Sequence, residues 1–104
     1  MNALSIENIR AKCKAGDIKW SAHAAARILQ RGISREDIIH CIMDGEIIEE
    51  YPDYWLSPAC LIFGHTKADT IIHVVVGVDD MVHIVTAYYP DEIKFMPDMK
   101  TRRK

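Results

Sequence analysis

The chain has 104 residues, a length typical of one domain, and its hydrophobic fraction of 49% is enough for a single core. Its 13 basic and 15 acidic residues nearly cancel, so any phosphate ligand has to be recognised by a local group of residues. No run approaches the roughly 20 apolar residues of a membrane span, and the N-terminus lacks the apolar core of a signal peptide. We therefore expect a single cytoplasmic domain over residues 1–104, with no membrane partner.

The three cysteines, Cys13, Cys41 and Cys60, are an odd number at wide spacing with no CxxC pair. This pattern fits neither a disulfide framework nor a zinc knuckle, so we expect ordinary reduced cysteines. A single thiol nucleophile is the alternative, and only Cys41, which follows His40, has a neighbour that would favour it.

Apolar residues at helical spacing predict a first helix from Ser5 to Ala15, which ends at Gly16. Ile18 to Trp20 then has the pattern of a brief strand. The next helix is predicted from Ala22 to Arg31, with Ser21 as the residue that caps its start.

A third helix is predicted after Ser34, where Asp37 stands in a capping-box position, and Gly45 ends it. Four strands rich in β-branched and aromatic residues follow. Their order predicts an α+β fold with the N-terminal helices packed on one face of a four-stranded, mostly antiparallel sheet. The other face is left to bind a ligand, and residues 96–104 are predicted to form a frayed basic tail that tracks a polyanion. The predicted strands are Glu46 to Tyr51, Ala59 to His65, and the two strands within Thr70 to Pro90.

The segment from Thr70 to Pro90 is predicted to be the central hairpin of the sheet. A two-residue loop at Asp79 and Asp80 places His73 opposite Thr86, whereas a three-residue loop moves His73 off Thr86.

Side chains alternate along a strand, so this register puts His73, Thr86 and Tyr88 on one face and His83 on the other. Three groups that pass or hold protons would then be adjacent on a rigid surface, which indicates a functional site.

On the second helix His23, Arg27 and Arg31 are spaced four apart and form a polar stripe. The two arginines offer fixed charge and bidentate donors that suit a phosphodiester. His23 lies in the first turn, where the helix dipole favours a neutral ring that accepts a proton.

Metal-independent RNA cleavage needs one histidine that takes a proton, another that gives one, and arginines that stabilise the charged phosphorane. The 2′-hydroxyl supplies the nucleophile. We therefore predict His23 and His73 as the acid–base pair, with Arg27 and Arg31 binding the phosphate. Tyr88 would donate a hydrogen bond or stack on a base, and Thr86 would orient either His73 or a phosphate oxygen.

Each of these residues also has a structural interpretation. His73 is equally well a buried imidazole hydrogen-bonded to Thr86, the arginines can be solvated or paired, and Tyr88 can be an ordinary strand aromatic. A metal site is a further interpretation of five histidines, but the chain has no HExxH and no His-x-His. We therefore expect no metal and no cofactor.

Five stretches of the chain, in this order, resemble a known family. The similarity covers about Lys19 to Phe95 and is to the small prokaryotic family catalogued as domain of unknown function number 4258. The stretches are IKWSAHAAARILQRGIS (Ile18 to Ser34), GEIIEEYP (Gly45 to Pro52), ACLIFG (Ala59 to Gly64), IHVVV (Ile72 to Val76) and IVTAYYP (Ile84 to Pro90).

This resemblance implies a RelE-like fold of the barnase, colicin and RelE ribonuclease group. It also implies a toxin encoded beside an antitoxin protein that has a zinc finger and a helix-turn-helix part. The family's motif positions correspond here to those of the predicted site, namely His23, Arg27, Arg31, His73, Thr86 and Tyr88.

Our leading hypothesis is a metal-independent endoribonuclease, the toxin of a toxin–antitoxin pair, with RNA as substrate, either free or as ribosome-bound mRNA, and an antitoxin as partner. Ribonuclease toxins of this fold tend to be strongly basic, whereas this chain has a net charge of −2. The alternative hypothesis is therefore a non-catalytic module on the same fold that binds nucleic acid or protein.

Overall fold

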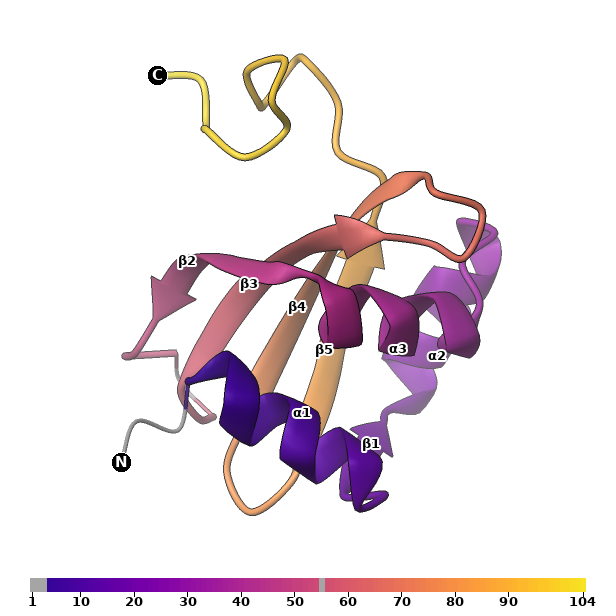
Figure 1. The fold of residues 1–104 in the computed structure, drawn as a ribbon, viewed down its shortest axis with the longest axis vertical. Helices are drawn as coiled ribbons and strands as arrows, with labels where there is room; N and C mark the ends of the chain where they lie inside the picture. Colours follow the sequence, from indigo (N-terminus) through magenta and orange to yellow (C-terminus); the bar gives the residue numbers. More distant parts are fainter. Residues whose placement is uncertain (1–3, 55) are drawn as a thin grey trace.

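The structure is a computed structural model that describes residues 4–54 and 56–104. In this part of the chain α1 and α3 cover one face of a sheet, and the residues after the last strand lie on the other side (Figure 1). The predicted α+β class is therefore confirmed. The helices are α1 (Ile6–Lys14), α2 (Ala22–Gln30) and α3 (Arg35–Asp44), and the strands are β1 (Ile18–Trp20), β2 (Glu46–Tyr51), β3 (Ala59–His65), β4 (Ile71–Val78) and β5 (Val82–Tyr88).

A serine side chain caps the start of each of the three described helices, and two of these caps were predicted. Ser21 Oγ accepts a hydrogen bond from the Ala24 N–H at 3.0 Å at the start of α2. At the start of α3 the Asp37 N–H donates to Ser34 Oγ at 3.0 Å, and the Asp37 carboxylate accepts from the Ser34 N–H. Both caps are confirmed, and each satisfies backbone N–H groups that have no partner within the helix.

The sheet has the strand order β1-β5-β4-β3-β2. Strands β2 to β5 pair antiparallel, as expected, whereas β1 joins the edge of β5 in parallel. The prediction of four strands was therefore wrong, because the described sheet is five-stranded and mixed. A strand of three residues carries too short a pattern to reveal its partner. Its pairing begins where the Asp17 carbonyl accepts a hydrogen bond from the Val82 N–H at 2.8 Å.

The loop between β4 and β5 has three residues, so the predicted two-residue loop was wrong. Val78 pairs with Val82 across residues 79–81. The Asp79 carboxylate accepts a hydrogen bond from the Met81 N–H at 2.8 Å, which stabilises the longer loop.

A bulge in β5 shifts the pairing by one further residue. His73 therefore lies opposite Tyr88, and the predicted pairing with Thr86 was wrong. On the loop side of the bulge His83 pairs with Gly77. Since paired residues share a face, His83 is on the same face as His73 rather than on the opposite one.

The two faces of the sheet are covered in different ways. The face toward α1 and α3 carries the main core, which includes Ile62, Val74 and Val76. The other face carries His73 and is covered at its His73 end by residues 91–104, which we call the C-terminal segment. This segment includes the predicted frayed tail, and it folds back on the sheet with Phe95 only 1% exposed.

Candidate functional site

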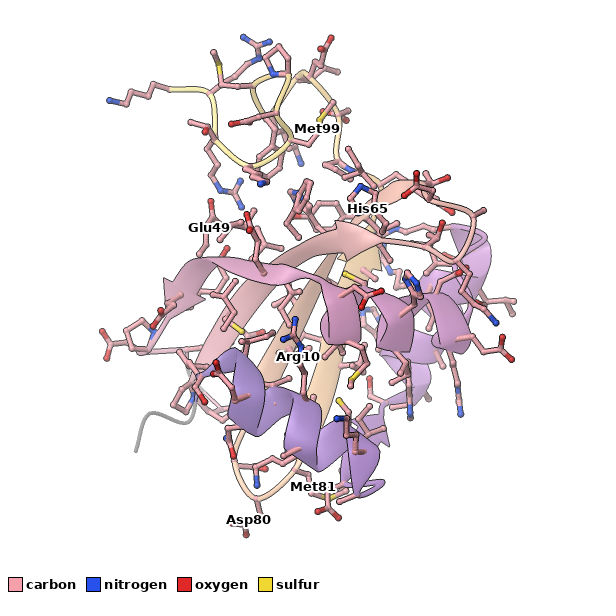
Figure 2. All side chains as sticks on the ribbon, in the orientation of Figure 1. Arg10, Glu49, His65, Asp80, Met81 and Met99 are labelled. Carbon is pink, nitrogen blue, oxygen red and sulfur yellow. The ribbon has the colours of Figure 1, made fainter. Side chains whose placement is uncertain are left out.

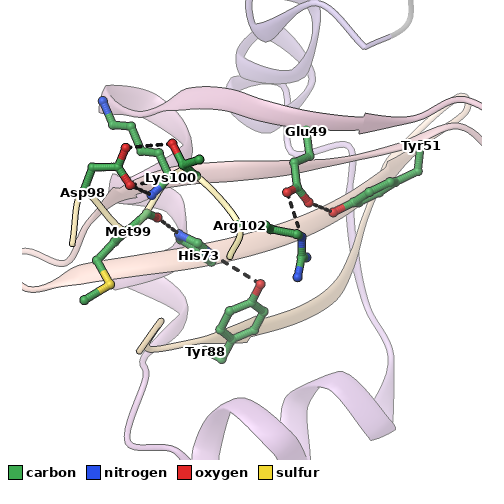
Figure 3. Close-up of polar contacts among 9 residues, drawn as sticks. Glu49, Tyr51, His73, Tyr88, Asp98, Met99, Lys100 and Arg102 are labelled. Carbon is green, nitrogen blue, oxygen red and sulfur yellow. Dashed lines mark hydrogen bonds and ion pairs between the residues drawn. The ribbon is translucent and has the colours of Figure 1, made fainter. Parts of the chain in front are cut away.

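His73 lies on the face covered by the C-terminal segment and is 0% exposed. Its Nε2 atom is 2.6 Å from the Met99 carbonyl oxygen, and its Nδ1 atom is 3.3 Å from the Tyr88 hydroxyl oxygen (Figure 3). Because a carbonyl only accepts, Nε2 carries the proton and Nδ1 of the neutral ring accepts from Tyr88. His73 is therefore a hydrogen-bond acceptor placed directly behind the Tyr88 phenol.

Three aromatic rings surround the His73 imidazole. The ring centroids of Phe95, Tyr88 and Phe63 lie 4.6, 5.3 and 6.1 Å from it, each in an edge-to-face arrangement. Burial among them lowers the pKa of His73, because the imidazolium would lose its hydration. Burial likewise raises the pKa of Tyr88. Both groups are therefore uncharged at neutral pH.

A bulge in β2 brings two glutamates onto the same face as His73. The register shifts before Glu49, so Glu46 and Glu49 both face this side although strict alternation would separate residues three apart. Lys100 Nζ lies 2.8 Å from the Glu46 carboxylate, and Arg102 Nε lies 2.8 Å from the Glu49 carboxylate. These two ion pairs hold the C-terminal segment against the sheet.

The Glu49 carboxylate is also hydrogen-bonded by the Tyr51 hydroxyl (Figure 3). Burial alone would raise the pKa of Glu49, but the hydrogen bonds from Arg102 and Tyr51 lower it. Hydrogen bonding to Glu49 and then to Tyr51 raises the pKa of Arg102. The guanidinium carbon of Arg102 also lies 4.9 Å from the centre of the Phe95 ring. Arg102 is thus a fixed positive charge at the edge of the site.

Beside Tyr88 there is a cavity of about 310 Å³, which we call the cationic pocket. Three of its lining side chains are cations, and Asp91 is the one carboxylate among the described lining residues. This excess of positive charge suits an anion. The pocket is lined by Arg31, Tyr88, Tyr89, Pro90, Asp91, Lys94, Phe95 and Arg102.

Arg31 is held in place by the part of β5 that lies beyond its pairing with β1. Its Nη1 atom donates to the Ala87 carbonyl at 2.8 Å and to Thr86 Oγ1 at 3.0 Å. The Nε and Nη2 atoms have no hydrogen-bond partner within the described residues, so they can donate to an anion.

Four of the six predicted site residues are brought together in this way. His73 is hydrogen-bonded to Tyr88, Arg31 is hydrogen-bonded to Thr86, and Arg31 and Tyr88 line the same pocket.

The other two predicted residues lie elsewhere. His23 lines a second cavity, of about 380 Å³, which we call the loop pocket because Asp79 of the β4–β5 loop borders it. His83 lines the loop pocket too, with its Nε2 atom 2.8 Å from an Asp79 carboxylate oxygen. Arg27 is exposed on α2 and lines neither cavity.

Glu49, Lys94, Met99 and Arg102 were not predicted as site residues. The cations of the C-terminal segment were visible as a basic tail, but their attachment depends on the bulge in β2. An irregularity of this kind has no signal in the alternation of residues.

The thiols and carboxylates offer little further chemistry. Burial raises the pKa of Cys41 and of Cys60 to about 12, and that of Cys13 to about 11, so these free cysteines stay protonated. In residues 4–54 and 56–104 no group of three or more His, Cys, Asp or Glu is placed to hold a metal ion. None of the helices there has the length and apolar character of a membrane span.

Comparison with known proteins identifies a family. Searches of the curated proteins and of the solved structures each found no match. The model of the family described as Domain of unknown function (DUF4258) matches residues 20–92, more than half of the chain. The match includes all six predicted site residues and ends before Lys94, Met99 and Arg102. The chain therefore belongs to the family of the domain of unknown function DUF4258.

Proposed function

We propose that this protein is an endoribonuclease that binds a phosphodiester of RNA in the cationic pocket and cleaves it without a metal ion. The observation that supports this most strongly is the position of Tyr88, which lines the cationic pocket and has a buried neutral imidazole behind its hydroxyl. Arg31 and Lys94 supply charge for the phosphate.

In the proposed reaction the Tyr88 oxygen takes the 2′-hydroxyl proton while its own proton passes to Nδ1 of His73. The 2′-oxygen attacks the adjacent phosphorus, and the bond from phosphorus to the 5′-oxygen breaks. Lys94 or water protonates the leaving oxygen, so the products are a 2′,3′-cyclic phosphate and a 5′-hydroxyl. Arg31 and Arg102 offset the negative charge on the phosphorane oxygens.

The remaining predicted residues take supporting roles. Thr86 orients Arg31 through their hydrogen bond. Arg27, which is exposed on α2, contacts a neighbouring phosphate of the RNA strand. An acid–base role for His23 stays a prediction, because its ring lines the loop pocket and not the cationic pocket, where the phosphodiester is proposed to bind.

The family resemblance extends this proposal to a biological role. We propose a RelE-like toxin that acts in the cytoplasm on free or ribosome-bound mRNA and is inhibited by an antitoxin protein covering the same face.

A second candidate function is a non-catalytic module that binds nucleic acid or protein. It is favoured by the 0% exposure of His73 and by the net charge of −2. In such a module the cationic pocket would bind its ligand and Tyr88 would only pack against it.

Induced expression in a bacterial host tests the proposal. Tyr88→Phe removes the hydroxyl that moves the proton, and Tyr89→Phe is its matched control because the Tyr89 hydroxyl has only a long 3.4 Å contact with the Gly32 carbonyl. We expect the wild type and Tyr89→Phe to stop growth and fragment total RNA, and Tyr88→Phe to do neither while still folding. Intact RNA in the wild-type culture would leave the binding module as the better account.

A further inference from the structure

We propose that the loop pocket binds one unpaired base of the RNA strand whose phosphodiester occupies the cationic pocket. This inference rests on the function proposed above and adds a substrate class, single-stranded RNA several nucleotides long. The two pockets lie at opposite ends of β5, since His83 lines the loop pocket and Tyr88 lines the cationic pocket. Because His83 pairs with Gly77 and Tyr88 with His73, both pockets are on the same face of the sheet.

Figure 2 shows the two ends, with Asp80 and Met81 of the β4–β5 loop at one end of the sheet and Met99 of the C-terminal segment at the other. Helix α2 lies alongside β5 and connects the pockets, because His23 in its first turn lines one and Arg31 just after its end lines the other.

The spacing along α2 fits a short stretch of RNA. Arg31 follows His23 by eight positions, which is about 12 Å along a helix axis at 1.5 Å per residue. A strand with stacked bases advances about 3.4 Å per nucleotide, so roughly three or four nucleotides cover this distance. Arg27 is exposed midway between the two and lies where the backbone of such a strand would pass.

The side chains of the loop pocket combine apolar walls with a few polar groups, as a flat heterocycle requires. Tyr54 and Leu56 are 36% and 69% exposed, so both offer surface on which a base can stack. His83 is held through Nε2 by Asp79, which leaves its Nδ1 atom without a hydrogen-bond partner in the described part of the chain. The His23 ring likewise has no hydrogen bond or ion pair there.

The charge of the loop pocket argues against a second phosphate. Its Asp79 carboxylate stays ionised, because the Met81 backbone N–H and then His83 lower the pKa of Asp79. A negative charge at the wall repels a phosphate but accepts a hydrogen bond from the amino edge of a base.

The experiment uses oligonucleotides that the protein cannot cleave. The probes are 2′-O-methylated pentaadenylate and pentauridylate, each also prepared with an abasic residue at each position in turn, and binding is measured by fluorescence anisotropy. The variants are His23→Ala and Tyr54→Ala, with Gln30→Ala on the exposed side of the same helix as the control. His23 has no partner in the described chain and alanine favours helix, so His23→Ala should fold, which a thermal melt checks.

For the wild type and Gln30→Ala we expect one abasic position to weaken binding about tenfold, the size expected for loss of one stacked base. In His23→Ala and Tyr54→Ala the intact probes should bind about as weakly as that abasic probe binds the wild type. The abasic residue should therefore cause no further loss of affinity in these two variants, and this loss is the abasic penalty. If abasic and intact probes bind the wild type equally well, the loop pocket does not hold a base, while RNA binding at the cationic pocket stands. An unchanged penalty in both variants also overturns the inference, and a failure of the wild type to bind any probe overturns the proposed function itself.

Discussion

The Nε2 atom of His73 and the backbone oxygen of Met99 lie 2.6 Å apart, which ties a buried histidine to a segment 26 residues further along the chain. This contact sets the proton on Nε2 and leaves Nδ1 to accept from Tyr88. The C-terminal segment therefore both buries His73 and defines which of its nitrogens faces the candidate site.

The pKa of His73 predicts how stability changes with pH. Burial lowers this pKa in the folded protein, so below the ordinary value of about 6.5 the unfolded chain binds a proton that the folded chain does not. The contribution of His73 is fully present above that pH and is lost as the pH falls toward the lowered value. We expect the free energy of unfolding, measured with urea, to fall more in the wild type than in His73→Gln between about pH 7.5 and about pH 5.5. Glutamine keeps an amide donor for Met99, and identical pH dependence in the two proteins would contradict this account.

The ion pair between Glu49 and Arg102 is expected to hold the C-terminal segment rather than the whole fold. Arg102 is about half exposed, and such a pair contributes no more than about 1 kcal/mol. Glu49→Gln should therefore leave the melting temperature nearly unchanged but speed amide hydrogen exchange in residues 98–103. The control is Glu50→Gln, an exposed neighbour in the same strand. Equal exchange rates in both variants would show that the pair does not anchor the segment.

Phe95 is expected to make the largest apolar contribution of the C-terminal segment. Its side chain is 1% exposed and packs against the His73 ring. Phe95→Ala should therefore lower the free energy of unfolding by about 3–5 kcal/mol. Ile93→Ala is the matched control, because Ile93 is 83% exposed and its loss should cost no more than about 0.5 kcal/mol. Similar effects of the two changes, measured by urea denaturation, would mean that the segment does not pack as described.

Local patterns in the sequence predicted most of the fold. Ser21 and Ser34 act on backbone groups three residues away, so their caps could be read directly. The bulges in β2 and β5 could not be read from the sequence, because each depends on packing between strands rather than on the alternation of residues. The three-residue loop and the bulge in β5 together exchanged Thr86 for Tyr88 opposite His73, and the loop alone moved His83 to the face that carries His73.

The candidate site was predicted only in part, because local patterns place some of its residues and irregular features of the chain place the others. The positions of His73, Thr86 and Tyr88 on one sheet surface followed from strand pattern, and Arg31 from the spacing of the helical stripe. The separation of His23 from this group follows from the length of α2, which places its two ends at different pockets. The contribution of Arg102 depends on a chain reversal after Phe95, which no periodicity indicates.

The most direct test of the central claim is a single-turnover assay with purified protein, a 5′-labelled RNA and a chelator, comparing wild type with Tyr88→Phe and Tyr89→Phe. We predict that the wild type and Tyr89→Phe yield fragments ending in a 2′,3′-cyclic phosphate and spare a substrate with a single 2′-deoxy residue at the cleavage position. Tyr88→Phe should bind the RNA but cleave it at least about a hundredfold more slowly. Equal cleavage by Tyr88→Phe and the wild type, or intact RNA bound by the wild type, would contradict the account.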